Sequence, residues 1–142
     1  MQKKIDRKFY RIIDANFNRA KEGLRVCEDI SRFFYNKKNV TRKYKNARHE
    51  LTEAIACLGL EKIIQARDIQ GDIGKKSSPS EFYRAKTKDV FYANAQRVKE
   101  SLRVLEEVTK LIDMKVAQDV KALRYKVYAL EKNVISMTKD FT

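Results

Sequence analysis

The sequence contains few of the residues that usually build metal sites, disulfide frameworks and irregular structure. Its 142 residues include one histidine, two cysteines, one proline and four glycines. The single histidine, His49, excludes the usual kinds of zinc site and a catalytic set built on several histidines. Cys27 and Cys57 are both flanked by apolar residues at helical spacing, so we expect two buried, reduced thiols rather than a disulfide.

Long apolar runs are also missing. The longest nearly uncharged stretch begins at Ala54 and reads AIACLGL, far short of the ~20 residues that span a bilayer. The N-terminal MQKKIDRK has no apolar segment behind its charges, so it does not resemble a signal peptide. We therefore expect a soluble, cytoplasmic protein with no membrane partner, forming a single domain over residues 1–142.

Positive charge is abundant and unevenly distributed. The formal net charge is +13, and residues 1–50 carry fifteen lysines and arginines against six acidic residues, whereas the remaining 92 carry seventeen against thirteen. This excess predicts an anionic partner. Both a nucleic acid and a small polyphosphate satisfy that requirement.

One stretch occurs twice. Residues 15–28 read ANFNRAKEGLRVCE and residues 93–106 read ANAQRVKESLRVLE, with nine of fourteen positions identical at an offset of 78. The apolar row drifted, because Ala20, Gly23 and Cys27 became Val98, Ser101 and Leu105. Asn16, Arg19, Glu22, Arg25 and Glu28 are all kept, as Asn94, Arg97, Glu100, Arg103 and Glu106. Since solvent tolerates most polar exchanges, this pattern indicates a chemical role held in two copies.

The apolar spacing predicts an all-α fold. We expect helices from Asp6 to about Tyr35, from Thr41 with an interruption at Gly59, from Thr87 or Asp89 to about Ile112, and from Val116 to Met137. No segment alternates with the period of a strand. Repeat one, about 6–66, and repeat two, about 89–138, are each a helical hairpin. The two should close into a four-helix bundle with an approximate two-fold axis, joined by a long functional loop over 67–88.

Beside the apolar row runs a polar row that contains Arg19 and Glu22, repeated as Arg97 and Glu100. We expect these side chains to be partly buried on the shoulder of the core. One interpretation is a ladder of ion pairs within each helix, Arg19 to Glu22 and Arg25 to Asp29, with Arg25 and Glu28 pointing further from the core. The other is a binding site.

Two further features leave alternatives open. Asn16 and Asn94 lie in the apolar row, where an asparagine either sets helix register or holds a ligand. His49 is either a surface residue or a catalytic one. Between the repeats, the loop offers Arg67, Asp68, Asp72, Gly74 and Lys75, which suit a phosphate although no P-loop motif is present.

The segments ANFNRAKEGLRVCED, KNARHEL, ARDIQGDIG and ANAQRVKESLRVLEE resemble the small hydroxymethylpyrimidine phosphate kinase family of thiamine biosynthesis, over about residues 10–130. Members of that family occur alone or fused to thiamine phosphate synthase. The resemblance implies ATP-dependent phosphorylation of hydroxymethylpyrimidine monophosphate to the diphosphate, with Mg²⁺ as a cofactor.

For this reaction we assign roles on physical grounds. Phosphoryl groups would be bound by Arg19, Arg97 and Arg67. Magnesium would be bound by Glu22 and Glu100 with Asp68 or Asp72. Asn16 or Asn94 would orient the pyrimidine or a metal-bound oxygen. The remaining candidates for substrate or nucleotide binding are Arg25, Arg103, Arg48, His49, Gly74 and Lys75. No general base is needed, because the attacking phosphate oxygen is already ionised.

Two other classes of function are weighed against the kinase. A basic helical nucleic-acid binder would use the doubled arginines as phosphate contacts, but the neighbouring glutamates would repel a phosphate backbone. A helix-pairing interaction module would use an exposed apolar row. Assembly of several copies is left open.

Overall fold

The computed structural model describes residues 6–138, apart from the side chain of Ser80, and within that range it is helical without strands. The all-α fold predicted from the sequence is therefore confirmed. In chain order the elements are α1 (Arg7–Asp29), a π-helical turn (Ile30–Phe34), α2 (Lys38–Ala56), α3 (Leu60–Gln65), α4 (Pro79–Phe82), α5 (Thr87–Thr109) and α6 (Met114–Thr138).

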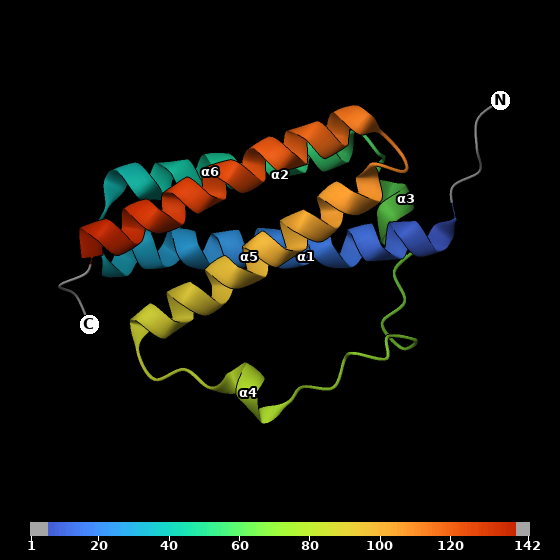
Figure 1. Ribbon diagram of the computed structural model, residues 1–142. Helices are drawn as coiled ribbons and strands as arrows, with labels where there is room; N and C mark the ends of the chain where they lie inside the picture. Colours follow the sequence, from blue (N-terminus) through green and yellow to red (C-terminus); the bar gives the residue numbers. More distant parts are fainter. Residues whose placement is uncertain (1–5, 139–142) are drawn as a thin grey trace.

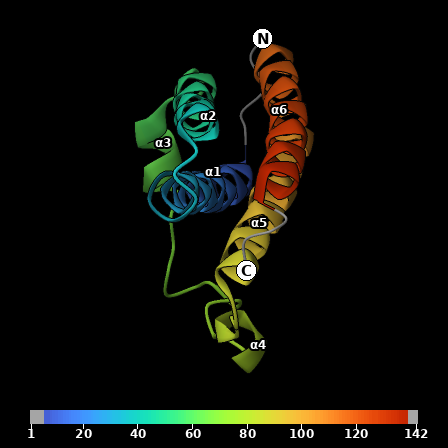
Figure 2. The same ribbon diagram turned by 90° about the vertical axis from the view of Figure 1, so that its left-hand side faces the viewer.

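The four long helices form a bundle of two antiparallel hairpins, α1 with α2 and α5 with α6 (Figure 1). Helix α1 packs against α2 and α5, and α6 packs against the same two helices. The α1–α5 interface is the most extensive, and α5 crosses α1 in the opposite direction. Figures 1 and 2 place the segment with α4 on the side of α1 and α5 that faces away from α2 and α6. One face of the α1–α5 layer is thus left for the connecting loop.

The apolar rows predicted for the second and fourth helices form much of the core. Every predicted member in α2 and α3 is buried, and α6 departs only at its end, where Met137 is 42% exposed and Thr138 is buried. The buried members are Val40, Tyr44, Ala47, Leu51, Ala54 and Leu58 in the first hairpin and Val116, Val120, Leu123, Val127, Leu130 and Val134 in the second. Burial of these rows holds the two hairpins together.

The end of the first helix differs from the prediction. We expected Ile30 and Phe34 in the core, but Ile30 is only partly buried and Phe34 is 50% exposed. The cause is the π-helical turn, which holds more residues than an α-helical turn and so rotates the following side chains. Ser31 and Tyr35 are buried in their place.

Gly23 lies where α1 and α5 cross most closely. A Cβ atom at this position would lie 2.6 Å from Val98 Cγ2 and 3.0 Å from the backbone oxygen of Asn94. The hydrogen side chain therefore allows the two backbones to approach. Cys27, one turn further, is fully buried, and burial raises its pKa to about 12. Cys57 is exposed, so the prediction of buried thiols is right for Cys27 and wrong for Cys57.

Local chemistry explains where the helices begin and where the chain turns. The Asp6 carboxylate accepts a hydrogen bond of 2.8 Å from the Lys8 backbone and caps α1, as predicted. Gly59 adopts a φ of 90° between α2 and α3, a conformation that other residues rarely tolerate. No helix within residues 6–138 combines the length and the apolar character needed to cross a membrane.

Candidate functional site

The residues of the doubled motif meet at a cleft between the α1–α5 layer and the loop. This cleft, here called the central cleft, has a volume of about 570 Å³. It is lined by Asn16 and Arg19 from α1, by Ala93, Arg97, Glu100, Ser101 and Val104 from α5, and by Gly74 and Glu81 from the connecting segment. Five of our predicted site residues are therefore brought together.

Arg19 and Arg97 occupy equivalent positions in the two repeats and both line the central cleft. Both side chains are exposed, and neither forms an ion pair or hydrogen bond with another residue of the described range. Our expectation of partial burial is therefore wrong. Two guanidinium groups without protein partners at one cleft suit a phosphate, because each offers a fork of donors that matches phosphate oxygens.

The neighbouring arginines behave differently. Arg25 Nε lies 3.4 Å from Asp29 Oδ1, and Arg103 Nε lies 3.4 Å from Glu107 Oε1, so the predicted ladder exists at these positions. Lys110 also donates to Glu107 at 3.0 Å and lowers the pKa of that carboxyl. The ladder does not extend to Arg19 and Glu22 within the described range. Arg25 and Arg103 thus pair along their own helices and do not line the central cleft.

The two asparagines share one hydrogen-bonding arrangement. Asn16 Nδ2 donates to the backbone oxygen of Ile12 at 2.9 Å, and Asn94 Nδ2 donates to that of Val90 at 2.8 Å. Asn16 is buried and lines the central cleft, whereas Asn94 does not line it. Because its Nδ2 is used within the helix, the Asn16 amide presents its oxygen as an acceptor for a ligand donor.

A second cleft adjoins the first along α1. This flanking cleft, of about 340 Å³, lies beneath the start of the loop and shares Arg19 with the central cleft. It is lined by Lys8, Arg11, Ile12, Ala15 and Arg19 from α1 and by Arg67, Asp68, Ile69 and Asp72 from the loop. Our sequence reasoning did not single out Lys8 and Arg11, although their spacing from Arg19 places all three on one helix face.

Arg67 is held by a partner that the sequence analysis missed. Its Nε donates to Asp14 Oδ2 at 2.7 Å and its Nη2 donates to Asp14 Oδ1 at 2.8 Å, and this pairing raises the pKa of Arg67. Asp14 is buried, so its carboxylate needs a cation. The bidentate pair anchors the start of the loop to α1, and the phosphoryl-binding role that we assigned to Arg67 stays a prediction. The signal available in the sequence was an acidic residue, Asp14, directly after the apolar Ile13.

The glycines of the loop are linked to its aspartates. The backbone N–H of Gly71 donates to Asp68 Oδ1 at 2.8 Å, and that of Gly74 donates to Asp72 Oδ1 at 2.9 Å. These contacts are turns in which a side chain replaces a backbone acceptor. Gly74 lines the central cleft. Lys75 is exposed and does not line it.

The predicted magnesium ligands are not gathered into one site. Residues 6–138 contain no group of three or more acidic, histidine or cysteine side chains able to hold a metal. Glu100 lines the central cleft, Asp68 and Asp72 line the flanking cleft, and Glu22 lines neither. A magnesium ion bound mainly by phosphate oxygens and water needs only one or two carboxylates, so these residues fit a magnesium phosphate complex and not a separate metal centre.

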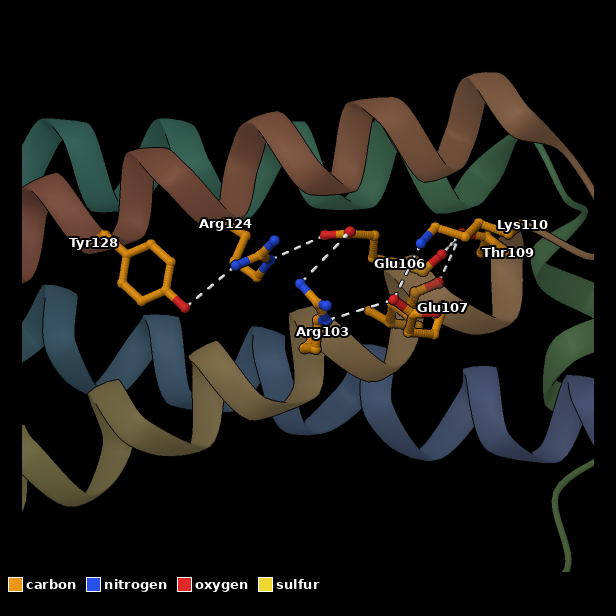
Figure 3. Close-up of polar contacts among 8 residues, drawn as sticks. Arg103, Glu106, Glu107, Thr109, Lys110, Arg124 and Tyr128 are labelled. Atoms are coloured by element: carbon orange, nitrogen blue, oxygen red, sulfur yellow. Dashed lines mark hydrogen bonds and ion pairs between the residues drawn. The ribbon is translucent and has the colours of Figure 1, made fainter.

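The repeated glutamates Glu28 and Glu106 are buried, and each pairs with an arginine of the following helix. Arg48 Nε lies 3.0 Å from Glu28 Oε1 and Arg124 Nε lies 2.9 Å from Glu106 Oε1, at equivalent positions of the two hairpins. Figure 3 shows Arg124 between Glu106 and Tyr128, whose hydroxyl it contacts at 3.2 Å.

Our prediction that Glu28 points away from the core is wrong, because Glu28 is buried. Arg48 pairs with Glu28 and lines neither cleft, and its role in binding a ligand stays a prediction. His49 is exposed on α2 and lines neither cleft.

Comparison with known proteins adds a family and a set of relatives. Residues 11–133 match the model of the ThiD2 family. A thiamine-phosphate synthase of Nostoc sp. is 43% identical over 135 residues, which cover 94% of this chain and 37% of that protein. A thiamine-phosphate synthase of Rhodopirellula baltica is 39% identical, covering 84% of this chain and 32% of that protein. The chain thus spans about a third of the length of these relatives. No solved structure matches it.

Proposed function

The chain belongs to the ThiD2 family, which links it to thiamine biosynthesis, and from this membership we propose that it is a kinase of that pathway. In this proposal it transfers a phosphoryl group from ATP, with magnesium, to hydroxymethylpyrimidine monophosphate and so forms the diphosphate. The observation that carries the proposal is the pair of unpartnered arginines, Arg19 and Arg97, at one cleft of about 570 Å³.

The main obstacle to such a reaction is repulsion between two phosphorylated substrates. Two unit charges about 4 Å apart repel by about 4 kcal/mol at an effective dielectric of about 20, and several charges meet on each side. Cations held in place before the reaction offset this repulsion without reorganising. Arg19 and Arg97 supply two such cations from opposite helices.

Other residues of the central cleft have matching roles in the proposal. The Asn16 amide oxygen accepts a hydrogen bond from the amino group of the pyrimidine, and Ser101 offers a hydroxyl nearby. Glu100 is the carboxylate placed to hold the magnesium that accompanies the phosphates. The attacking oxygen belongs to the substrate phosphate, so the absence of a histidine from the cleft is compatible with the reaction.

The name of the relatives suggests a second candidate function. They are called thiamine-phosphate synthases, and this chain matches only about a third of their length. We propose that the matched third carries the kinase step and that the rest of those proteins carries the synthase step. If the chain instead formed thiamine phosphate from a pyrimidine diphosphate without ATP, the name of the relatives would apply to this segment.

The decisive experiment is an assay for ADP release from ATP and magnesium. The monophosphate is the acceptor, and the unphosphorylated pyrimidine alcohol is the control. Turnover on the monophosphate and not on the alcohol is expected, because Arg19 and Arg97 act on two phosphates. No ADP release from a folded protein would reject the kinase proposal.

Replacing Arg97 tests the arginine pair. Arg97→Ala should lower kcat/KM for the kinase reaction by about a hundredfold or more, the usual scale for losing one transition-state cation. Arg103→Ala is the matched control on the same helix, because Arg103 pairs with Glu107 outside the cleft. It should change kcat/KM by less than about threefold. Equal losses in the two variants, with unchanged circular dichroism, would contradict the assignment.

A further inference from the structure

The two clefts lie side by side along α1 and share one residue, Arg19. We propose that the flanking cleft binds the nucleoside triphosphate, that the central cleft binds the pyrimidine phosphate, and that Arg19 contacts the phosphoryl group passing between them. This inference rests on the kinase proposal and assigns each substrate to a place. The reaction breaks the bond between the terminal phosphorus and its bridging oxygen, which leaves on ADP, and forms a bond from that phosphorus to an acceptor phosphate oxygen.

The charge of α1 in the flanking cleft suits a polyphosphate. Lys8, Arg11 and Arg19 follow one another at steps of three and eight residues on one helix face, and together they span about 16 Å at the rise of an α-helix. Arg11 makes only a 3.5 Å contact with the neutral backbone oxygen of Asp68. The Lys8 and Arg19 side chains have no ion pair with any residue of 6–138. Three positive charges thus remain for a ligand.

The second repeat keeps this row only in part, because Arg11 is replaced by an acidic residue, and this makes the two halves unequal. At the offset of 78, Lys8, Arg11, Ala15 and Arg19 correspond to Lys86, Asp89, Ala93 and Arg97. Asp89 accepts hydrogen bonds from the Ala85 and Lys86 backbones at 3.1 and 3.0 Å, so it serves the start of α5. The α1 side therefore carries more positive charge and matches the more negative substrate, the triphosphate.

The walls of the flanking cleft suit the rest of a nucleotide. Ile12 is 38% exposed and Ile69 is 67% exposed, so aliphatic surface is open on both the helix and the loop. Flat, largely apolar bases bind against such surfaces. Asp68 and Asp72 each use one oxygen for a glycine N–H, which leaves the other for the magnesium that accompanies a triphosphate.

The repeat provides a matched pair of variants for the test. Ala15 lines only the flanking cleft and Ala93 lines only the central cleft, at equivalent positions of the two helices. Ala15→Leu should raise KM for MgATP by about tenfold with little change in KM for the acceptor, and Ala93→Leu should do the reverse. Leucine is a good helix former and both positions are partly exposed, so the fold should persist.

A measurement without turnover keeps this assignment separate from the kinase proposal. Binding of a trinitrophenyl-labelled ATP, followed by fluorescence and competed with unlabelled ATP, should weaken about tenfold in Ala15→Leu and stay within about twofold in Ala93→Leu. Lys132→Ala, an exposed change on α6, is the control and should leave binding unchanged.

The outcomes are distinct. No ADP release from the wild type, together with loss of nucleotide binding in Ala15→Leu alone, would reject the kinase and keep the nucleotide subsite. The subsite assignment would be overturned if the wild type releases ADP and Ala93→Leu raises the KM for ATP. It would also be overturned if both variants raise the KM for ATP. The absence of nucleotide binding to the wild type would overturn it as well. Arg19→Ala should lower kcat more than it raises either KM, because Arg19 lies at the junction.

Discussion

At the scale of single residues, the partner of each arginine decides its role. Arg19 and Arg97 line the central cleft without a protein partner in the described range, whereas Arg25 and Arg103 pair along their own helices. The sequence predicted the second kind, because partners four residues apart share a helix face. It did not predict that Arg48 reaches Glu28 across two helices, since that contact depends on how α1 and α2 pack.

The buried pair Arg124–Glu106 offers a test of stability at this scale. Arg124 is 7% exposed and also contacts the Tyr125 and Tyr128 rings. Arg124→Ala should lower the free energy of unfolding by about 3 to 5 kcal/mol, because the buried Glu106 carboxylate keeps only a 3.9 Å contact with the exposed Arg103. Urea unfolding followed by circular dichroism measures the change.

Two companion variants show whether the ion pair is the cause. Arg103→Ala removes an exposed charge that lies 3.4 Å from Glu107 and 3.9 Å from Glu106, and it should cost less than about 1 kcal/mol because Arg124 still pairs with Glu106. The double variant Glu106→Leu/Arg124→Met should recover most of the stability, since no unpaired charge remains in the core. An Arg124→Ala protein as stable as Arg103→Ala would disprove the structural role.

At the scale of elements, the α1–α5 crossing sets the geometry of the central cleft, which is lined from both helices. The repeat predicted two similar helices, and the structure shows that their contact is not symmetric in detail, because Gly23 in α1 corresponds to Ser101 in α5. Glycine lets Val98 approach the α1 backbone, and Ser101 is buried beside the central cleft. The π-helical turn at the end of α1 has no counterpart in the described end of α5. Neither feature follows from apolar spacing.

The close approach at Gly23 can be tested by adding one methyl group. Gly23→Ala should lower the free energy of unfolding by about 1 to 2 kcal/mol, because the clash with Val98 outweighs the better helix propensity of alanine. When Val98 is already replaced by alanine, Gly23→Ala should lower the free energy of unfolding by less than it does in the wild type. Chemical denaturation of all three variants checks this, and a stabilised Gly23→Ala would show that the helices separate freely.

At the scale of the whole molecule, the loop and the charge decide how substrates reach the site. Between Arg67 and Thr87 every side chain that the structure describes is exposed, while the start of the segment is tied to α1 by Asp14. The net charge of +13 favours anions in general. We propose a small polyphosphate as the partner rather than nucleic acid, because Glu100 lies beside the free arginines at a cleft of limited volume.

The loop should be the first place where trypsin cuts. Lys75, Lys76 and Arg84 are exposed there, and few backbone hydrogen bonds hold the segment. MgATP together with the pyrimidine phosphate should slow this cleavage several-fold, because ligands in both clefts contact the loop. Mass spectrometry of timed digests locates the cuts. Cleavage first within the long helices, or a loop cut that ligands leave unaffected, would contradict this view of the loop.

The sequence by itself determined the four long helices, their buried rows, the loop between the hairpins and the repeat that points to a doubled site. The helices and their buried rows depend on neighbours within about four residues, which periodicity records directly, and the repeat is seen by comparing two segments of the sequence. Only the tertiary structure decided that Arg19 and Arg97 are free while Arg67 and Arg48 are paired. Those outcomes depend on which helices cross and how closely, and contacts such as Arg67 with Asp14, 53 residues apart, leave no periodic trace in the chain.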